Sequence, residues 1–349
     1  MIILERIFSR EKSFFYFQLW NDSDRLGYSR FLDYQVKNSA FTILPPGQKG
    51  SVWYDPAEMK QIIEQIKKYL IPNEVVISDL KSTLDEHWPF LLPYLKKEKE
   101  VESGEELSEY YEHLLGWWSA FTAVFFLPDL PEAPKEFNEY LLAYRAESEK
   151  YTEQMNKVFV NAWNKLMPKH ADLTHFISPY EAVKVLCNDS DSEKITSDVR
   201  RRINGFGMLN EKIYANLDEF NVALSKAGLS IDDGDAKGIK EVKGTVSYRN
   251  KEKMKIQGKV RVIVSFADMP SFQDGEILVT EMTNPDYVPI MKKAGAVITD
   301  EGGMTCHASI ASRELQVSCI VGTKIASKAF KTGDMLEIDM EKGVARILK

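Results

Sequence analysis

The chain has 349 residues, enough for two or three domains that each bury a hydrophobic core. Hydrophobic residues make up 44% and charged residues 28%, an ordinary balance for a soluble globular protein. The formal net charge is −7, of which residues up to 240 carry about −9 and the remainder about +2. The acidic first part argues against nucleic acid as a partner.

The composition also bears on cellular location. The most apolar stretch, Leu114 to Leu127, is shorter than the ~20 residues that span a bilayer, so we expect a buried helix and no membrane contact. No cationic start precedes an apolar run, which predicts no secretory leader. Cys187, Cys306 and Cys319 have no paired spacing, which fits a reducing cytoplasm and neither a disulfide framework nor a zinc site.

Residues 1–238 are predicted to be a mostly helical domain. In "DPAEMKQIIEQIKKYL" Asp55 is the expected N-cap, Pro56 takes the first helical position, and apolar residues then keep to one face. A second helix is expected in "EELSEYYEHLLGWWSAFTAVFFL". Its aromatic residues either pack in the core or line a pocket for a large apolar substrate.

The same domain continues with a third, long helix, predicted over residues 134–167. Ser178, Pro179 and Glu181 then form a capping box with proline at the first helical position. The following stretch, "DVRRRINGFGMLNEKIYANLDEFNVALSKAGL", predicts either more helix or a short hairpin and then a helix.

The pattern changes near "IDDGDAKGIKEVKGTV", where Gly and Asp cluster. Short β-branched runs follow, punctuated by Gly, Pro and Asn: "GKVRVIVSF", "EILVTE", "GAVIT", "SCIVG" and "MLEIDM". Two helices are expected between them, near residues 287–293 and 306–315. We therefore place a linker at about 236–242 and a compact α/β domain over residues 239–349.

One histidine has an unusual setting, in "GGMTCHASIASRE". Thr305 stands where an N-cap is expected, and His307 falls in the first turn of the helix, whose free N–H groups and dipole favour an anion. An imidazole nitrogen held there can act as a nucleophile toward a phosphoryl group. Five residues are expected to support the phosphate. Gly302 and Gly303 allow the backbone to approach it closely, and Thr305 and Ser309 can donate hydrogen bonds to its oxygens. Arg313 can pair with the phosphate or with a carboxylate.

The stretch "ITDEGGMTCHASIASRELQVSCIVGT" resembles the signature of the swivelling phosphohistidine domain of the phosphoenolpyruvate-utilising enzymes, which include phosphoenolpyruvate synthase, pyruvate phosphate dikinase and rifampin phosphotransferase. The resemblance covers residues 240–349. It implies that His307 is the phosphorylated residue, Thr305 the threonine of the Thr-x-His motif, and Arg313 with Glu314 the Arg-Glu pair that follows. One departure is visible: Gln316, Val317 and Ser318 stand where the family usually has Gly-Ile-Pro.

The periodicity predicts a mostly helical first domain, and the resemblance implies that a swivelling β/β/α phosphohistidine domain follows it, so we expect a multidomain α and α/β fold. No ATP-grasp-like or P-loop-like segment is found, and the chain ends soon after the histidine domain. We therefore expect no cofactor bound by this chain, ATP and Mg²⁺ on a separate ATP-grasp-type protein, and no pyruvate-binding barrel. The order of domains is similar to the latter part of rifampin phosphotransferase.

Two classes of function follow from this interpretation. In the first, the protein is a phosphotransferase component in which His307 carries a phosphoryl group from the nucleotide-binding partner to a small-molecule acceptor at the helical domain. In the second, it is a phosphocarrier or regulatory binding module that has no acceptor site of its own. A degenerate scaffold is a third possibility. The sequence names neither the acceptor nor the oligomeric state.

Overall fold

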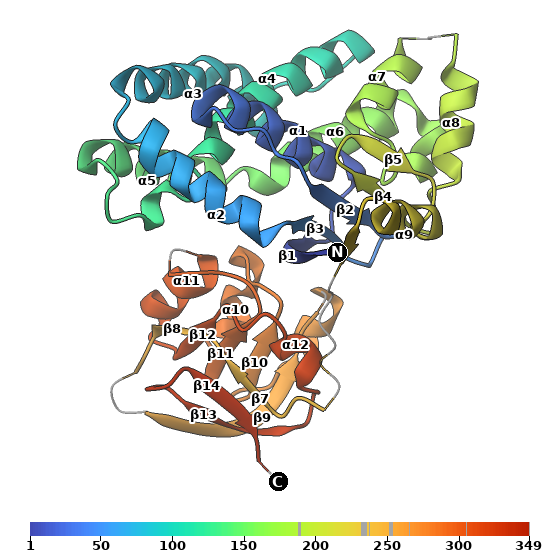
Figure 1. Ribbon diagram of the computed structural model, residues 1–349. Helices are drawn as coiled ribbons and strands as arrows, with labels where there is room; N and C mark the ends of the chain where they lie inside the picture. The colour runs from blue at the N-terminus through green and yellow to red at the C-terminus, as the bar shows by residue number, and fades with distance from the viewer. Residues whose placement is uncertain are drawn as a thin grey trace. The chain divides into compact units, whose positions relative to one another are not determined.

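The computed structural model describes residues 1–187, 190–231, 236, 238–250, 254–264, 266–304 and 306–348. The chain divides into two compact units, Met1–Asp232 (unit 1) and Asp233–Lys349 (unit 2), which Figure 1 colours blue to olive and orange to red. Each unit has hydrophobic cores of its own. Part of the predicted linker lies outside the described residues, and the boundary between residues 238 and 239 stays a prediction.

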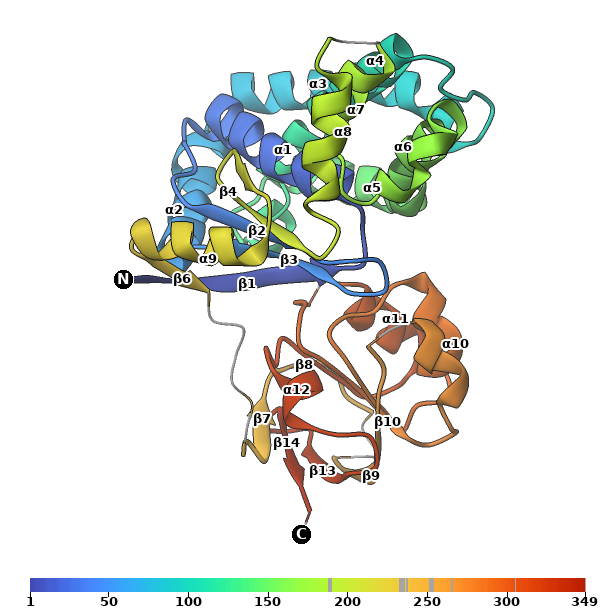
Figure 2. The same cartoon turned by 90° about the vertical axis from the view of Figure 1, so that its right-hand side faces the viewer.

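Unit 1 is built on a sheet in the order β5-β4-β2-β3-β1-β6, in which β1 and β6 run parallel and the other neighbours antiparallel. Successive side chains point to opposite faces. Val52 therefore packs with the helices in the main core, whereas Trp53 packs with Phe220 of α9 on the other face. Helix α9 lies beside this sheet (Figure 2). The strands are β1 (Ile2–Arg10), β2 (Ser39–Ile43), β3 (Gly50–Tyr54), β4 (Phe206–Leu209), β5 (Lys212–Tyr214) and β6 (Leu229–Ile231).

The helices of unit 1 follow the sequence pattern closely at their starts. Asp55 accepts a hydrogen bond from Ala57 N, and the capping box of Ser178 and Glu181 is formed, so both predicted helix starts are confirmed. Over the described part of the chain, every helix is too short or too polar to span a bilayer. The helices are α1 (Phe14–Leu32), α2 (Pro56–Gln65), α3 (Glu74–Leu95), α4 (Gly104–Ala123), α5 (Lys135–Glu149), α6 (Thr152–Leu166), α7 (Pro179–Leu186), α8 (Ser192–Arg200) and α9 (Leu217–Lys226).

The prediction of one long helix over residues 134–167 was wrong, because the segment is broken between α5 and α6. The Ser148 hydroxyl donates to Arg145 O, and Tyr151 N bonds Ser148 O in a tighter turn. Serine bonds of this kind compete with the helical ladder, so the apolar periodicity continues across a break that it does not reveal.

The sheet of unit 1 was not predicted from the sequence. β2 and β3 are covered on both faces, and almost every residue in them is buried. Strands of this kind lack the alternation of apolar and polar residues that marks a strand. The β4–β5 pair is the short hairpin that was one of the two alternatives for its segment, and α9 follows it.

Unit 2 is β-rich, with the sheet order β7-β14-β13-β9-β10-β11-β12-β8. Strands β9 to β12 run parallel at its centre, antiparallel strands flank them, and separate apolar clusters occupy its two faces. All five predicted strand runs form strands. The elements are β7 (Glu241–Lys243), β8 (Thr245–Tyr248), β9 (Lys255–Val262), β10 (Ile277–Thr280), α10 (Val288–Met291), β11 (Ala296–Thr299), α11 (His307–Leu315), β12 (Cys319–Val321), α12 (Ala326–Ala329), β13 (Met335–Asp339) and β14 (Val344–Ile347).

Candidate functional site

The candidate site lies where the neighbouring parallel strands β10, β11 and β12 end. Their carboxyl ends meet at one edge of the sheet, so the segments that follow them, residues 281–284, 300–304 and 322–325, lie side by side. Backbone hydrogen bonds join them: Glu301 N to Glu281 O is 2.8 Å, and Lys324 N to Asp300 O is 2.9 Å. This edge is where open α/β sheets commonly bind ligands.

The two glycines before the histidine have different settings. Gly302 has φ +107°, in the region that favours glycine, and a Cβ there would lie 2.6 Å from Cys306 Sγ. Gly303 has no positive φ, and a Cβ there would meet nothing within 4 Å. The backbone therefore requires glycine at Gly302, whereas Gly303 leaves open space beside the loop. Close approach of a phosphate at this pair stays a prediction.

Helix α11 begins one residue later than the sequence indicated. Cys306, in extended conformation, is the N-cap and His307 is the first helical residue, so placing Thr305 at the N-cap was wrong. Thr305 itself lies outside the described residues. His307 is half-buried at the end of the helix where the first N–H groups lack helical acceptors and the dipole is positive. A negatively charged group on the imidazole is stabilised by that end of the helix.

A second side chain holds the histidine from the neighbouring loop. Thr283 Oγ1 lies 2.8 Å from His307 Nδ1, and Thr283 is only 3% exposed. A neutral imidazole has one donor and one acceptor nitrogen, and a threonine hydroxyl can pair with either, donating to a bare Nδ1 or accepting from a protonated one. When Nδ1 keeps its proton and Thr283 accepts it, Nε2 carries the lone pair. The sequence analysis missed Thr283, although a threonine just after a buried strand parallel to the strand before the histidine is a usable signal.

The two other predicted phosphate-supporting side chains contact the backbone of the loop. Ser309 is fully buried, and its hydroxyl donates to Gly303 O at 2.7 Å. The Arg313 guanidinium donates to Ser309 O at 3.1 Å and also to Met304 O. Through these hydrogen bonds both side chains connect α11 to the loop that precedes it. Their predicted contacts with phosphate stay predictions.

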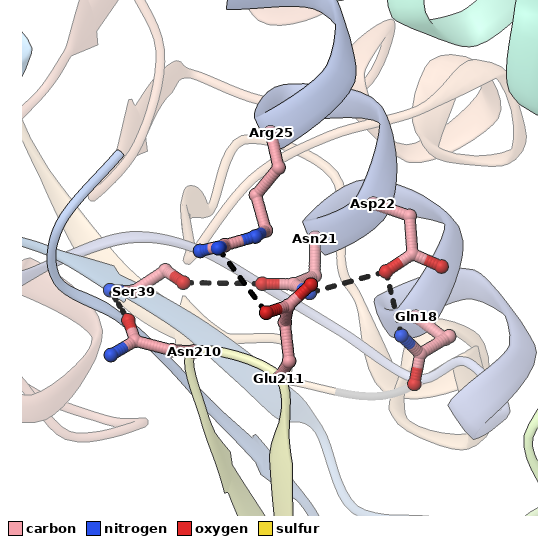
Figure 3. Close-up of polar contacts among 7 residues, drawn as sticks. All are labelled: Gln18, Asn21, Asp22, Arg25, Ser39, Asn210 and Glu211. Carbon is pink, nitrogen blue, oxygen red and sulfur yellow. Dashed lines mark hydrogen bonds and ion pairs between the residues drawn. The ribbon is translucent and has the colours of Figure 1, made fainter. Parts of the chain in front are cut away.

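Unit 1 contains a polar network centred on helix α1 (Figure 3). Asp22 accepts hydrogen bonds from Gln18 and Asn21, and burial raises the pKa of Asp22. Two tyrosines donate to the same carboxylate, Tyr111 at 2.9 Å and Tyr180 at 2.7 Å. A carboxylate with four donors is well satisfied, so this network ties α1 to α4 and α7. Its other members are Arg25 paired with Glu211, and Ser39 with Asn210 and Asn21.

The remaining histidines do not gather into a metal site. His87 and His113 meet across α3 and α4, with their Nδ1 atoms 3.1 Å apart, and burial lowers the pKa of His87. His170 and His175 lie elsewhere in unit 1, where His175 Nε2 is 2.7 Å from Leu44 O. Among the residues that the structure describes, no cluster of three or more His, Cys, Asp or Glu side chains is arranged to hold a metal ion.

The aromatic residues of α4 are largely core residues. Trp117 and Trp118 are 1% and 4% exposed and pack on one another at 5.6 Å between ring centroids. Phe121 stacks on Trp117 at 5.1 Å, and Phe125 carries the Arg145 guanidinium at 4.7 Å. This packing favours the core alternative over a lined pocket for these side chains.

Comparison with known proteins gives a family match that lies in unit 2. The family described as "PEP-utilising enzyme, mobile domain" matches residues 272–343. A probable phosphoenolpyruvate synthase of Archaeoglobus fulgidus is 56% identical over 87 residues, which are 25% of this chain and 12% of the synthase. The phosphoenolpyruvate synthase of Pyrococcus furiosus is 52% identical over 87 residues, 25% of this chain and 11% of the synthase.

Solved structures give weaker likenesses. The aconitase X of Thermococcus kodakaraensis matches 31% of this chain and 98% of that chain at 18% identity, with a TM-score of 0.24. The chain spans only about an eighth of the length of the phosphoenolpyruvate synthases it matches. The C-terminal part of the chain, with His307 at the start of α11, is a mobile phosphohistidine domain of the phosphoenolpyruvate-utilising enzymes, related to that of phosphoenolpyruvate synthase.

Proposed function

We propose that the protein is a phosphotransferase component that carries a phosphoryl group on Nε2 of His307. The observation that supports this choice of atom is the 2.8 Å contact between Thr283 Oγ1 and His307 Nδ1. With its proton on Nδ1, the imidazole attacks phosphorus through the Nε2 lone pair. The N–P bond forms as the bond to the donor's leaving oxygen breaks, and the helix N-terminus stabilises the added negative charge.

The phosphoryl donor in this proposal is ATP, bound with Mg²⁺ on a separate ATP-grasp-type protein. In the second step the N–P bond breaks as a small-molecule acceptor, bound at unit 1, takes the phosphoryl group. Movement of unit 2 between the two sites delivers the group, as mobile elements do in other enzymes. The dense internal packing of each unit supports a role for unit 2 as a separate carrier.

Phosphate uptake at His307 tests the proposal directly. The chain is incubated with a purified ATP-grasp partner, ATP and Mg²⁺, and the bound phosphate is located by mass spectrometry. We expect one phosphate, labile to acid and stable to base as a phosphoramidate is, and we expect His307→Ala to abolish it.

His170→Ala is the matched control, because His170 is also half-buried but lies in unit 1. Its label is expected to equal that of the wild type. Acid-labile phosphate at the wild-type level in His307→Ala would show that another residue is the carrier.

A further inference from the structure

The loop that carries His307 is fastened through the side chain of Asp300. Asp300 follows β11 directly, is 3% exposed, and stands before the glycine pair, within the stretch that resembles the family signature. Its carboxylate accepts a hydrogen bond from Ser327 N at 3.0 Å and another from the Ser327 hydroxyl. Thr323 Oγ1 lies 3.1 Å from Asp300 Oδ1. Burial raises the pKa of Asp300, and the hydrogen bonds from Ser327 and Thr323 oppose that rise.

These contacts join the segment after β11 to the segment after β12. The backbone adds to the connection, because Lys324 N donates to Asp300 O at 2.9 Å. A Cβ on Gly322 would lie 3.1 Å from Gly302 O, so the two segments are in close contact beside the glycine pair. The start of the histidine loop is therefore held on one side by a buried carboxylate and its three donors.

The same short stretch also connects to the segment that carries Thr283. Asp300 N donates to Thr280 O at 3.1 Å, and Glu301 N donates to Glu281 O at 2.8 Å. Thr283 follows two residues later and contacts His307 Nδ1. The residues around Asp300 thus set the distance between the loop of Thr283 and the loop of His307.

We infer that Asp300 is a positioning residue for the phosphohistidine, which holds the loops after β10, β11 and β12 together so that Thr283 engages His307 Nδ1. The inference rests on the proposed function of His307. It assigns no contact between Asp300 and the phosphoryl group. A hydrogen bond to a buried carboxylate is stronger than one between neutral groups, which suits a group that must hold three segments in register.

The test uses the full chain and phosphoramidate, a small donor that needs no partner protein. Two properties are measured: the rate at which His307 gains phosphate, and the tautomer of the His307 imidazole by ¹⁵N NMR. For Asp300→Asn we expect uptake roughly tenfold slower, with a larger population of the tautomer that is protonated on Nε2. Ser327→Ala, which keeps the carboxylate and removes one donor, should shift both measurements in the same direction by less.

Asp339→Asn is the matched control. Asp339 also accepts backbone hydrogen bonds in unit 2, from Glu341 N and Lys342 N, but it is the last residue of β13, before the turn to β14. It is expected to keep the wild-type rate and tautomer. A folded Asp300→Asn or Ser327→Ala protein with wild-type rate and tautomer would overturn the inference. Failure of the wild type to gain phosphate at His307 would count against the proposed function instead.

Discussion

At the scale of single residues, the site depends on one contact between two neighbouring loops. His307 begins helix α11, and Thr283 follows strand β10, 24 positions earlier in the chain. In the proposed function the histidine provides the nucleophile, and a threonine that accepts the Nδ1 proton leaves the lone pair on Nε2. In other enzymes that use histidine, a partner on one ring nitrogen fixes the reactive state of the other in the same way.

Thr283→Val tests this contact, because valine keeps the shape of threonine and removes the hydroxyl. The net value of such a hydrogen bond is about 0.5–1.5 kcal/mol, so phosphate uptake at His307 should slow roughly 2- to 12-fold. The rate is measured with phosphoramidate on the folded protein. Thr283→Ser restores the hydroxyl and should recover most of the rate.

Thr332→Val is the control for a lost threonine hydroxyl in the same unit, since Thr332 Oγ1 accepts from Val262 N at 3.0 Å, at the end of β9. It should leave the uptake rate unchanged. Equal rates in Thr283→Val and wild type would remove the hydroxyl from the mechanism.

The two partners differ in how far the sequence could predict them. His307 stands in a local motif of glycines, threonine and histidine, so its proposed role as the phosphate carrier can be predicted from the neighbouring residues. The roles of Thr283 and Asp300 depend on which strands are parallel neighbours, and no local pattern records that. Ser309 and Arg313 lie in the motif, yet their hydrogen bonds go to loop carbonyls. A residue's place in the motif therefore did not reveal which atoms its side chain contacts.

At the scale of elements, the segment between β11 and α11 has to turn sharply to present the first turn of the helix. Gly302 makes this possible, with φ +107° and its Cα packed against Cys306, whereas Gly303 is open. The sequence predicted a glycine pair with one shared role. The structure separates the two positions, because only one has a backbone conformation that side chains disfavour.

Gly302→Ala should destabilise unit 2 by about 1–3 kcal/mol, since alanine is strained at this φ and its Cβ meets the Cys306 sulfur. Gly303→Ala should stay within about 1 kcal/mol of the wild type, because nothing lies near the new methyl group. Urea unfolding of both variants measures the difference. Equal stabilities would mean that the loop accepts a side chain at both positions, contrary to the geometry at Gly302.

The same scale explains which elements the sequence could predict. Five strands of unit 2, β9 to β13, are short β-branched runs between turn residues and were predicted, whereas β7, β8 and β14 were not. Helix starts in unit 1 could be predicted from N-cap residues such as Asp55 and Ser178. Strands β2 and β3 do not show the alternation of apolar and polar residues that predicts a strand. The reason is that the helices of the main core cover one of their faces and α9 covers the other. The break after α5 depends on one serine hydroxyl, which periodicity does not detect.

At the scale of the whole molecule, the proposed transfer requires that unit 2 work as a folded body apart from unit 1. Among the described residues, its apolar clusters are built from unit 2, from Val242 in one cluster to Val321 in the other. His307, Thr283 and Asp300 also lie within it, and so does the contact between Thr283 and His307. The carrier function should therefore be separable from the acceptor function.

A fragment of residues 233–349 should fold alone and gain phosphate at His307 from phosphoramidate. Its rate should be within about twofold of the rate of the full chain. The reason is that the activation free energy should change by less than about 0.5 kcal/mol when no contact of the site is lost. Circular dichroism and urea unfolding establish whether the fragment is folded. The fragment with His307→Ala is the control for phosphate bound at other residues.

The phosphorylated fragment is then mixed with residues 1–232 and candidate small alcohols. If unit 1 holds the acceptor, loss of the label should require both unit 1 and the correct acceptor. Loss of the label without unit 1, or no loss with any acceptor class, would favour a phosphocarrier without its own acceptor site. A fragment that does not fold would contradict the independence of unit 2.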